Sequence, residues 1–226
     1  MKRDELLAQL HQLVVAYRPA PHTVSQVKEV SLLMVIGPSG SGKTTIINAV
    51  KLPFVPSDTT RDARPGEVDG KDLFFLTNYD KVYEDISLGN FLQVAIGASG
   101  DLYATKPTSY PVSGVCVMPV MADVVPTFRA IGFKSTVSLF ITPPTYLEWM
   151  KRLSTHAMDA EALDRRLAEA YRSFSFALAD DQMHFILNDE VDKAVFQINE
   201  LINSRIQSVR ELTARSAAEE IFSHLK

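Results

Sequence analysis

The feature that most constrains this chain is the segment at residues 37–45, Gly-Pro-Ser-Gly-Ser-Gly-Lys-Thr-Thr, which matches the pattern G-x-x-x-x-G-K-[ST] in full. The apolar run at residues 30–36 predicts a buried strand before it, and residues 44–50, which lack Pro and Gly, predict a helix after it. At such a strand-loop-helix junction, successive backbone N–H groups converge on one anion at a helix N-terminus. The segment is therefore predicted to be a phosphate-binding loop.

The residue types within this loop suit Mg²⁺ with ATP as the bound cofactor pair. Its glycines allow backbone conformations and close approaches that a side chain would block. Lys43 is expected to reach the β- and γ-phosphates, and the Thr44 hydroxyl is expected to be the metal ligand. The residues of the loop predicted to bind ATP are Gly37, Ser39, Gly40, Ser41, Gly42, Lys43, Thr44 and Thr45.

Composition narrows the possible partners. The chain has 226 residues, 46% of them hydrophobic, which suits one fold with inserted lobes. Its net charge of −4 argues against nucleic acid, and no apolar run approaches the roughly 18 residues of a membrane span. The single Cys116 lies in an apolar run and excludes an intrachain disulfide, so a cytoplasmic setting is expected. A monomer and a homodimer both stay open.

Hydrophobic periodicity outlines the rest of the chain. Residues 1–18 form an amphipathic pattern that Pro19 and Pro21 end, and this predicted helix is expected to pack on the core. The second half alternates predicted helices and strands, at residues 123–131, 136–141, 145–153, 159–178 and 184–187. Beyond them a helical stripe is expected to comprise Val195, Ile198, Ile202, Val209 and Leu212. Such alternation predicts an α/β fold with a parallel sheet.

A charged loop follows the first helix of the core. Arg61 and Arg64 lie three residues apart in a segment that contains Gly and Pro, where they are well placed to bind an anion bidentately. A solvated loop without a ligand is the alternative. Glu67, Asp69 and Asp72 are expected to be solvated charges.

The pattern Ser-x-Thr-Thr-Arg-x-x-Arg-Pro-Gly-Glu-Val-x-Gly at residues 57–70, behind a phosphate loop, resembles the guanylate kinase family. Later segments are similar to the same family, at residues 91–92, 100–105, 139–144, 151–153, 165–167 and 186–189. The resemblance covers roughly residues 30–204. It implies a P-loop nucleoside monophosphate kinase with a three-layer α/β fold, a parallel sheet core, an inserted acceptor-binding lobe and a short lid.

The resemblance also implies an organisation and a set of site residues. A single domain would comprise an N-terminal helix and linker (1–28), a core (29–56 and 107–204), an acceptor-binding lobe (57–106), a lid (154–165) and a C-terminal helix (205–226). The acceptor would be held by Ser57, Arg61, Arg64, Gln93, Tyr103 and Thr105. Arg152 and Arg166 would join Lys43 as catalytic residues, and Asn188 would join the ATP-binding set. Such a cation cluster offsets the repulsion between two phosphorylated substrates.

The chain departs from the family pattern at the acceptor base and the metal. Leu73 stands where the family has a Tyr, Gln93 stands where it has a Glu, and His156 replaces a lid arginine. The strand at residues 115–121 carries no carboxylate, so guanine loses an acceptor and Mg²⁺ loses a ligand. Because Gln93 accepts only once and this strand offers no partner for the N2 amino group of guanine, GMP is expected to be a poor acceptor.

Three functions remain open on the sequence. The first is a kinase that phosphorylates a phosphorylated small molecule other than GMP. The second is an ATP-binding pseudo-kinase or regulatory module without turnover. The third is a true guanylate kinase with substituted base contacts.

Overall fold

The computed structural model describes residues 1–97, 99–154, 160–204 and 209–226. His156, the helix cap expected at Asp159 and the central part of the expected lid lie outside the described residues. The helices are α1 (Arg3–Ala16), α2 (Pro21–Ser25), α3 (Lys43–Val50), α4 (Tyr79–Ser87), α5 (Val125–Ala130), α6 (Tyr146–Ser154), α7 (Ala160–Ala179), α8 (Val191–Ser204) and α9 (Val209–Ser223), with 3-10 turns η1 (Pro107–Ser109) and η2 (Ala122–Val124). The strands are β1 (Val30–Ile36), β2 (Ser57–Thr59), β3 (Leu73–Phe75), β4 (Gln93–Ile96), β5 (Leu102–Thr105), β6 (Gly114–Pro119), β7 (Ser135–Thr142) and β8 (Met183–Leu187).

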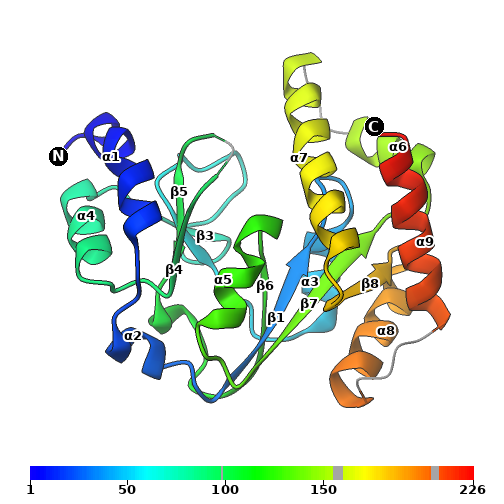
Figure 1. Cartoon of the computed structure of the whole chain (residues 1–226), viewed down its shortest axis with the longest axis horizontal. Helices are drawn as coiled ribbons and strands as arrows, with labels where there is room; N and C mark the ends of the chain where they lie inside the picture. The colour runs from blue at the N-terminus through cyan, green and yellow to red at the C-terminus, as the bar shows by residue number, and fades with distance from the viewer. Residues whose placement is uncertain (98, 155–159, 205–208) are drawn as a thin grey trace. The chain divides into compact units, whose positions relative to one another are not determined.

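The described strands form two sheets, with the orders β6-β1-β7-β8 and β3-β2-β5-β4 (Figure 1). In the first, β7 and β8 pair in parallel, with Phe140 opposite Phe185. In the second, β2 pairs in parallel with β3 and antiparallel with β5, which pairs antiparallel with β4. The expected α/β fold with a parallel sheet core is confirmed.

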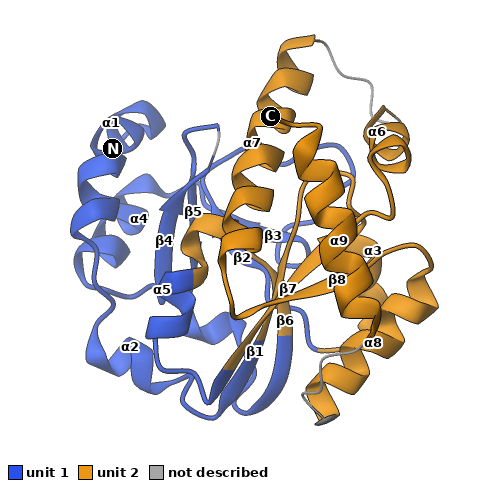
Figure 2. Ribbon diagram, turned by 45° about the vertical axis from the view of Figure 1, so that its right-hand side comes forward, with its two compact units in different colours: residues 1–32, 53–116, 126–135 blue, residues 33–52, 117–125, 136–226 orange. Residues whose placement is uncertain are grey.

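The chain divides into two compact units, shown in different colours in Figure 2. Unit 1 comprises residues 1–32, 53–116 and 126–135, and unit 2 comprises residues 33–52, 117–125 and 136–226. Each unit is described by itself below. None of the helices in the described part of the chain is long and apolar enough to cross a membrane.

Unit 2 has a sheet covered by helices on both faces. Successive side chains of a strand point to opposite faces, so Leu139 and Ile141 lie on one side of β7 and Phe140 on the other. The first two pack in a core with residues of α3 and α8, whereas the Phe140 ring lies 5.0 Å from that of Phe174 in α7. Burial on both faces explains why the strands of this sheet read as continuous apolar runs rather than alternating ones.

Unit 1 has a core of its own, to which α1 contributes. Leu6 and Leu10 are fully buried and pack with Val82 and Ile86 of α4 and with residues of β4 and β5. The expectation that the N-terminal helix packs on a core is confirmed for this unit. Tyr17, at the end of α1, donates a hydrogen bond to the Phe91 carbonyl. Burial raises the pKa of its phenol to about 12.

The expected C-terminal stripe is wrong in its last members. Val209 and Leu212, which belong to α9, are 81% and 58% exposed, and α9 buries a different set of residues. The buried residues of α9 are Glu211, Ala214, Ala218 and Ile221. Its two buried alanines let the helix backbone approach its neighbours closely. The stripe extrapolated from α8 into α9 therefore placed the wrong face of α9 inside.

A buried carboxylate lies in the small sheet of unit 1. Asp58 is 3% exposed, and its Oδ2 has no hydrogen-bond partner among the described residues. Burial raises the pKa of Asp58 to about 6, while Lys106 opposes that rise and Asp85 adds to it. Asp58 lies opposite Ala104 in the register, on the face that packs towards the core of this unit. No pattern in the sequence indicates that this position is buried.

We expect Asp58→Asn to stabilise the protein in a pH-dependent way. Because the native pKa lies above the unfolded value, ionisation of Asp58 disfavours the fold, and native stability falls as the pH rises from about 4 through 6. The gain from Asp58→Asn should therefore grow over this window and level off above it, at about 2 to 3 kcal/mol. Urea unfolding between pH 4.5 and pH 8 measures it. The exposed Asp181→Asn serves as the control, and a gain that is constant with pH would contradict the argument.

Candidate active site

The loop between β1 and α3 needs glycine at two positions, Gly40 and Gly42. Gly40 and Gly42 have φ angles of 78° and 93°, in the left-handed region that favours glycine. Gly42 is also the N-cap of α3, and a Cβ there would lie 2.2 Å from Asn188 Nδ2. Gly42 therefore allows both the left-handed backbone conformation of the turn and the close approach of Asn188.

Side chains from several elements of unit 2 donate hydrogen bonds to the carbonyl oxygens of this loop. The bonds are Lys43 Nζ to Gly37 O (2.7 Å) and Pro38 O (2.9 Å), Trp149 Nε1 to Ser39 O (2.8 Å), and Asn188 Nδ2 to Ser41 O (2.7 Å). Because these carbonyl oxygens are bonded to protein donors, the backbone groups that the loop can offer a ligand are its N–H groups. Among the described residues, the N–H groups of Gly40 and Gly42 have no acceptor. This arrangement is an anion cradle.

Lys43 begins α3 and lies inside the loop. Loss of hydration lowers the pKa of its ammonium to about 8, with nearby Glu169 opposing the shift and Arg166 adding to it. Its neighbours Thr44 and Thr45 are exposed in the first turn of the helix. The lysine is thus held between the carbonyls that it contacts and the position where an anion would bind.

The two arginines expected near the transferred group both lie beside the loop. Arg166 of α7 donates from Nη1 to Ser39 Oγ at 2.5 Å. Arg152 of α6 donates from Nε to Glu148 at 3.0 Å and from Nη1 to the Asn188 carbonyl at 3.1 Å. All residues predicted for ATP and catalysis therefore lie in unit 2, within one hydrogen-bonded network or in the first turn of α3.

The donor set fits a magnesium ion bound mainly by phosphate. The described residues contain no group of three or more His, Cys, Asp or Glu side chains that could hold a metal. Mg²⁺ keeps several waters and typically takes only one or two protein ligands beside substrate phosphates. The exposed Thr44 hydroxyl, in the first turn after the cradle, suits that role.

The residues predicted to bind the acceptor lie in unit 1. Gln93 lies opposite Thr105, and Tyr103 lies opposite Thr59, so these side chains share one face of the small sheet. Ser57, two residues before Thr59, belongs to the same face. The strands thus bring together four of the predicted side chains, which are Ser57, Gln93, Tyr103 and Thr105.

Arg61 is held at the edge of this face by several partners. Its guanidinium forms two hydrogen bonds to the Glu67 carboxylate, both 2.7 Å, and its Nε donates to Tyr103 Oη at 3.0 Å. The Glu67 and Tyr103 contacts raise the pKa of Arg61 above its ordinary value. Glu67 also accepts from the backbone N–H of the exposed Arg64, at 2.8 Å. The expectation that Glu67 is merely solvated is wrong, since the turn brings it to the arginine.

Gln93 is one of the buried polar residues of this face, together with Thr59 and Thr105. It is 4% exposed, and its Nε2 has no hydrogen-bond partner among the described residues. Thr105 Oγ1, on the opposite strand, accepts from Tyr110 Oη at 3.2 Å. A buried amide donor of this kind is poised for an acceptor atom on a ligand.

Sequence reasoning missed two members of the site. No role in the site is predicted from the sequence for Tyr110 or for Trp149, and Trp149 Nε1 donates to Ser39 O. A buried indole N–H usually needs a partner, and this rule was the available signal for Trp149. For Tyr110 the sequence offered no such signal.

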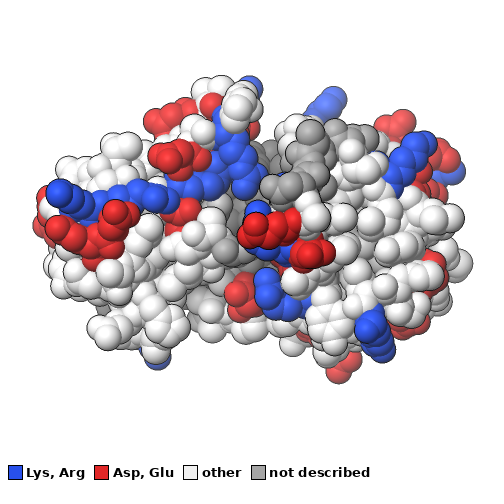
Figure 3. Space-filling model, turned by 90° about the horizontal axis from the view of Figure 1, so that it is seen from above, with Lys and Arg blue, Asp and Glu red and all other residues white. Residues whose placement is uncertain are grey.

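On the face shown in Figure 3, basic and acidic side chains lie beside each other.

A buried strand, a glycine-rich anion cradle and a lysine at the start of the next helix define a P-loop nucleotide-binding protein. The chain belongs to the guanylate kinase family, because the family model "Guanylate kinase" matches residues 29–205. A guanylate kinase of Wolbachia pipientis is 34% identical over 195 residues, covering 80% of this chain and 93% of the relative. That of Gloeobacter violaceus is 35% identical over 197 residues, covering 83% and 92%.

More distant relatives agree with this assignment. A human guanylate kinase is 28% identical over 190 residues, covering 79% of this chain and 95% of the relative. The crystal structure of a guanylate kinase from Anaplasma phagocytophilum has a TM-score of 0.57 at 22% identity, covering 87% of this chain and 96% of that one. The likeness to the crystal structure extends the agreement to the fold.

We expect the affinity for Mg·ATP to fall as the pH rises above about 8. Lys43 loses its proton there, whereas bound phosphates favour the ammonium form, so binding must take up a proton. Calorimetry between pH 7 and pH 9, in buffers of different ionisation enthalpy, measures the uptake. Lys43→Arg keeps a permanent charge and should abolish it. Equal proton uptake by the variant would assign the effect to another group.

Proposed function

We propose that the protein transfers the γ-phosphoryl group of Mg·ATP to GMP. The observation that carries this proposal is the cluster of Lys43, Arg152 and Arg166 around a loop whose carbonyls are bonded to protein donors. The relatives reported above are named guanylate kinases, which favours GMP as the acceptor and gives no support to a module without turnover.

Catalysis would consist mainly of positioning and charge stabilisation. The N–H groups of the loop and Lys43 hold the β- and γ-phosphates, and bound Mg²⁺, with Thr44 as protein ligand, neutralises developing charge. Arg166 and Arg152 exchange their present acceptors, Ser39 Oγ and Asn188 O, for oxygens of the transferred group. Because each arginine exchanges one hydrogen-bond acceptor for another, the exchange leaves few donors unpaired.

The acceptor phosphate would be bound in unit 1. The double contact with Glu67 and the bond to Tyr103 fix the Arg61 guanidinium, so little side-chain freedom is lost when phosphate binds. Arg64, which is exposed, adds a second cation, and Ser57 adds a hydroxyl. An arginine fork matches phosphate oxygens bidentately, whereas a lysine would provide only a point charge.

Gln93 is proposed to read the base. Its Nε2 can donate to guanine O6 while its Oε1 accepts from N1–H, but it leaves the N2 amino group unread. The same amide can turn over to meet adenine, which has a donor beside an acceptor. We therefore infer that GMP is accepted with weaker discrimination than two carboxylates would provide, and that IMP, which lacks the amino group, is also a substrate.

A coupled assay of ADP release tests the proposed function. It compares GMP, dGMP, IMP, AMP, CMP and UMP, and GMP is expected to give the highest kcat/KM. Lys43→Met should lower turnover more than a hundredfold by removing charge from the β/γ-phosphates. ATP binding without turnover on any monophosphate would instead identify a pseudo-kinase, and a higher kcat/KM for another base would identify another acceptor.

The specificity proposal makes its own prediction. Gln93→Glu supplies a second acceptor for the N1–H and N2 amino groups, so the ratio of kcat/KM for GMP to that for IMP should rise roughly tenfold or more. Steady-state kinetics with both substrates measure it. Gln197→Glu, a buried glutamine of unit 2, tests whether any buried carboxylate has this effect. An unchanged GMP to IMP ratio in Gln93→Glu would remove Gln93 from the base site.

A further inference from the structure

Helix α9 lies outside the segment that matches the family model, which ends at residue 205. Within unit 2 it packs along β8 and α7 (Figure 1). Glu211, which is 2% exposed, contacts His184 Nδ1 of β8 at 3.0 Å. Arg215 donates to the Leu178 carbonyl of α7 at 2.8 Å, and its guanidinium lies 5.1 Å from the centre of the Phe185 ring. The helix is thus an integral part of this unit.

The first turn of α9 holds the segment that follows β8. Arg210 Nη2 donates to the Leu187 carbonyl at 3.2 Å and to Asp189 Oδ1 at 2.6 Å. Burial would raise the pKa of Asp189, but the Arg210 bond and backbone N–H groups hold it below its ordinary value. Arg210 therefore binds the chain on both sides of one residue, Asn188.

Asn188 joins this segment to the phosphate loop. It is 5% exposed, its backbone N–H donates to Thr142 O at 2.8 Å, and its Nδ2 donates to Ser41 O at 2.7 Å. Its own carbonyl accepts from Arg152. Any shift of residues 187–189 would therefore move both a loop carbonyl and a predicted catalytic arginine.

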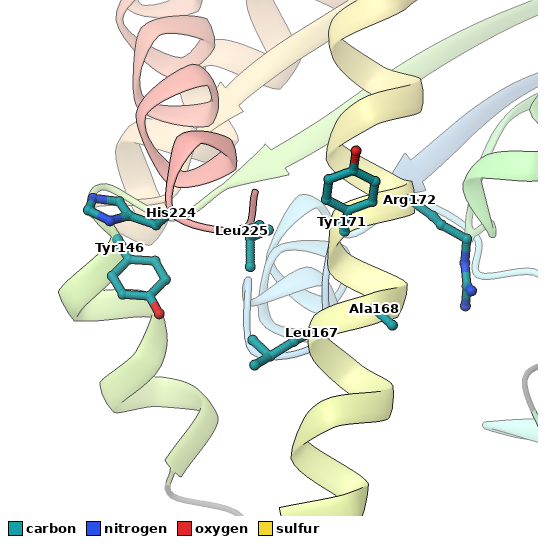
Figure 4. A pocket seen from close by; sticks show the side chains of 7 residues that line it. All are labelled: Tyr146, Leu167, Ala168, Tyr171, Arg172, His224 and Leu225. Carbon is teal, nitrogen blue, oxygen red and sulfur yellow. The ribbon is translucent and has the colours of Figure 1, made fainter.

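The far end of α9 reaches the helices that carry the two arginines. The His224 ring stacks on Tyr146 of α6, with centroids 4.5 Å apart, and Phe222 lies 5.2 Å from Tyr171 of α7. Figure 4 shows His224 and Tyr146 on one side of a cavity of about 440 Å³ and Tyr171 on the other. Arg172 points away from these rings. Helix α9 thus contacts the segment around Asn188 at one end, and α6 and α7 at the other.

We propose that α9 is a positioning element of the ATP site and that Arg210 is its positioning residue. Arg210 holds residues 187–189 in place, so that Asn188 keeps the Ser41 carbonyl turned away from the phosphates. The proposal deepens the proposed function, because it rests on ATP being bound at this loop. Both partners of the Arg210–Asp189 pair are about one third exposed, so its loss affects geometry more than folding.

The chain contains a reporter for this test. Trp149 is its single tryptophan, and the indole N–H bonds the loop at Ser39 O. The fluorescence of the free protein and its change with Mg·ATP therefore report on the loop and on binding, without any need for turnover. The variants to compare are Arg210→Met, Arg210→Lys and the control Arg215→Met, which lies on the same helix and faces α7.

Arg210→Met should shift the Trp149 emission and raise the Kd for Mg·ATP roughly tenfold, with the KM for GMP unchanged. Arg210→Lys should recover part of the affinity, since it keeps the charge towards Asp189. Arg215→Met should lower the melting temperature at least as much and leave the Kd within about twofold. A purely structural role of α9 would make both variants behave alike and would overturn the proposal.

The outcomes separate this proposal from the proposed function. If Arg210→Met binds Mg·ATP as the wild type does, with the same emission, the positioning role is refuted even when GMP is phosphorylated. If the expected loss occurs but GMP is not phosphorylated, only the acceptor assignment fails. Should Arg210→Met not fold, Asp189→Asn removes the charged partner instead, and an unchanged Kd in that variant would refute the proposal.

Discussion

The site depends on where the carbonyl oxygens of one short loop point. A loop whose N–H groups are to face an anion cannot also leave its carbonyls facing that anion, because the two dipoles oppose each other. Here Lys43, Trp149 and Asn188, from three different elements, draw four carbonyls into hydrogen bonds with protein donors. The cradle is thus set by Lys43 of the motif itself and by Trp149 and Asn188, which are distant in the sequence, and the glycines make the conformation accessible.

The cations of the site are already hydrogen-bonded in this structure. Arg61 is paired with Glu67, Arg152 with Glu148, and Arg166 with Ser39 Oγ. These contacts fix the guanidinium groups and limit the side-chain entropy that is lost on binding. In the proposed reaction these contacts would also divide the roles, since Arg61 has a carboxylate partner and would serve a static site. Arg166, bonded to a neutral hydroxyl, would give up less on turning to a phosphoryl group.

Each compact unit contains the residues for one half of the proposed reaction. Unit 2 holds the loop, Lys43 and the two arginines, and unit 1 holds the face with Gln93 and Tyr103. The units also differ in how they are stabilised. The sheet of unit 2 is buried on both sides by helices. The sheet of unit 1 packs one face on α1 and α4, where Asp58 is buried, and carries the residues proposed to bind the acceptor on the other.

The sequence by itself determined the α/β class and the loop motif between a strand and a helix, and it singled out Arg61 and Arg64 as candidate anion-binding residues, because these depend on local motifs and on periodicity. Tertiary structure alone decided that Glu67 pairs with Arg61, that Asp58 is buried, and that α9 turns its alanines inward in place of Val209 and Leu212. The first depends on how the turn between Arg61 and Glu67 folds, and the other two depend on which face a segment presents to distant residues. Local patterns carry no information on that choice, since the same stripe can meet solvent or a neighbouring element.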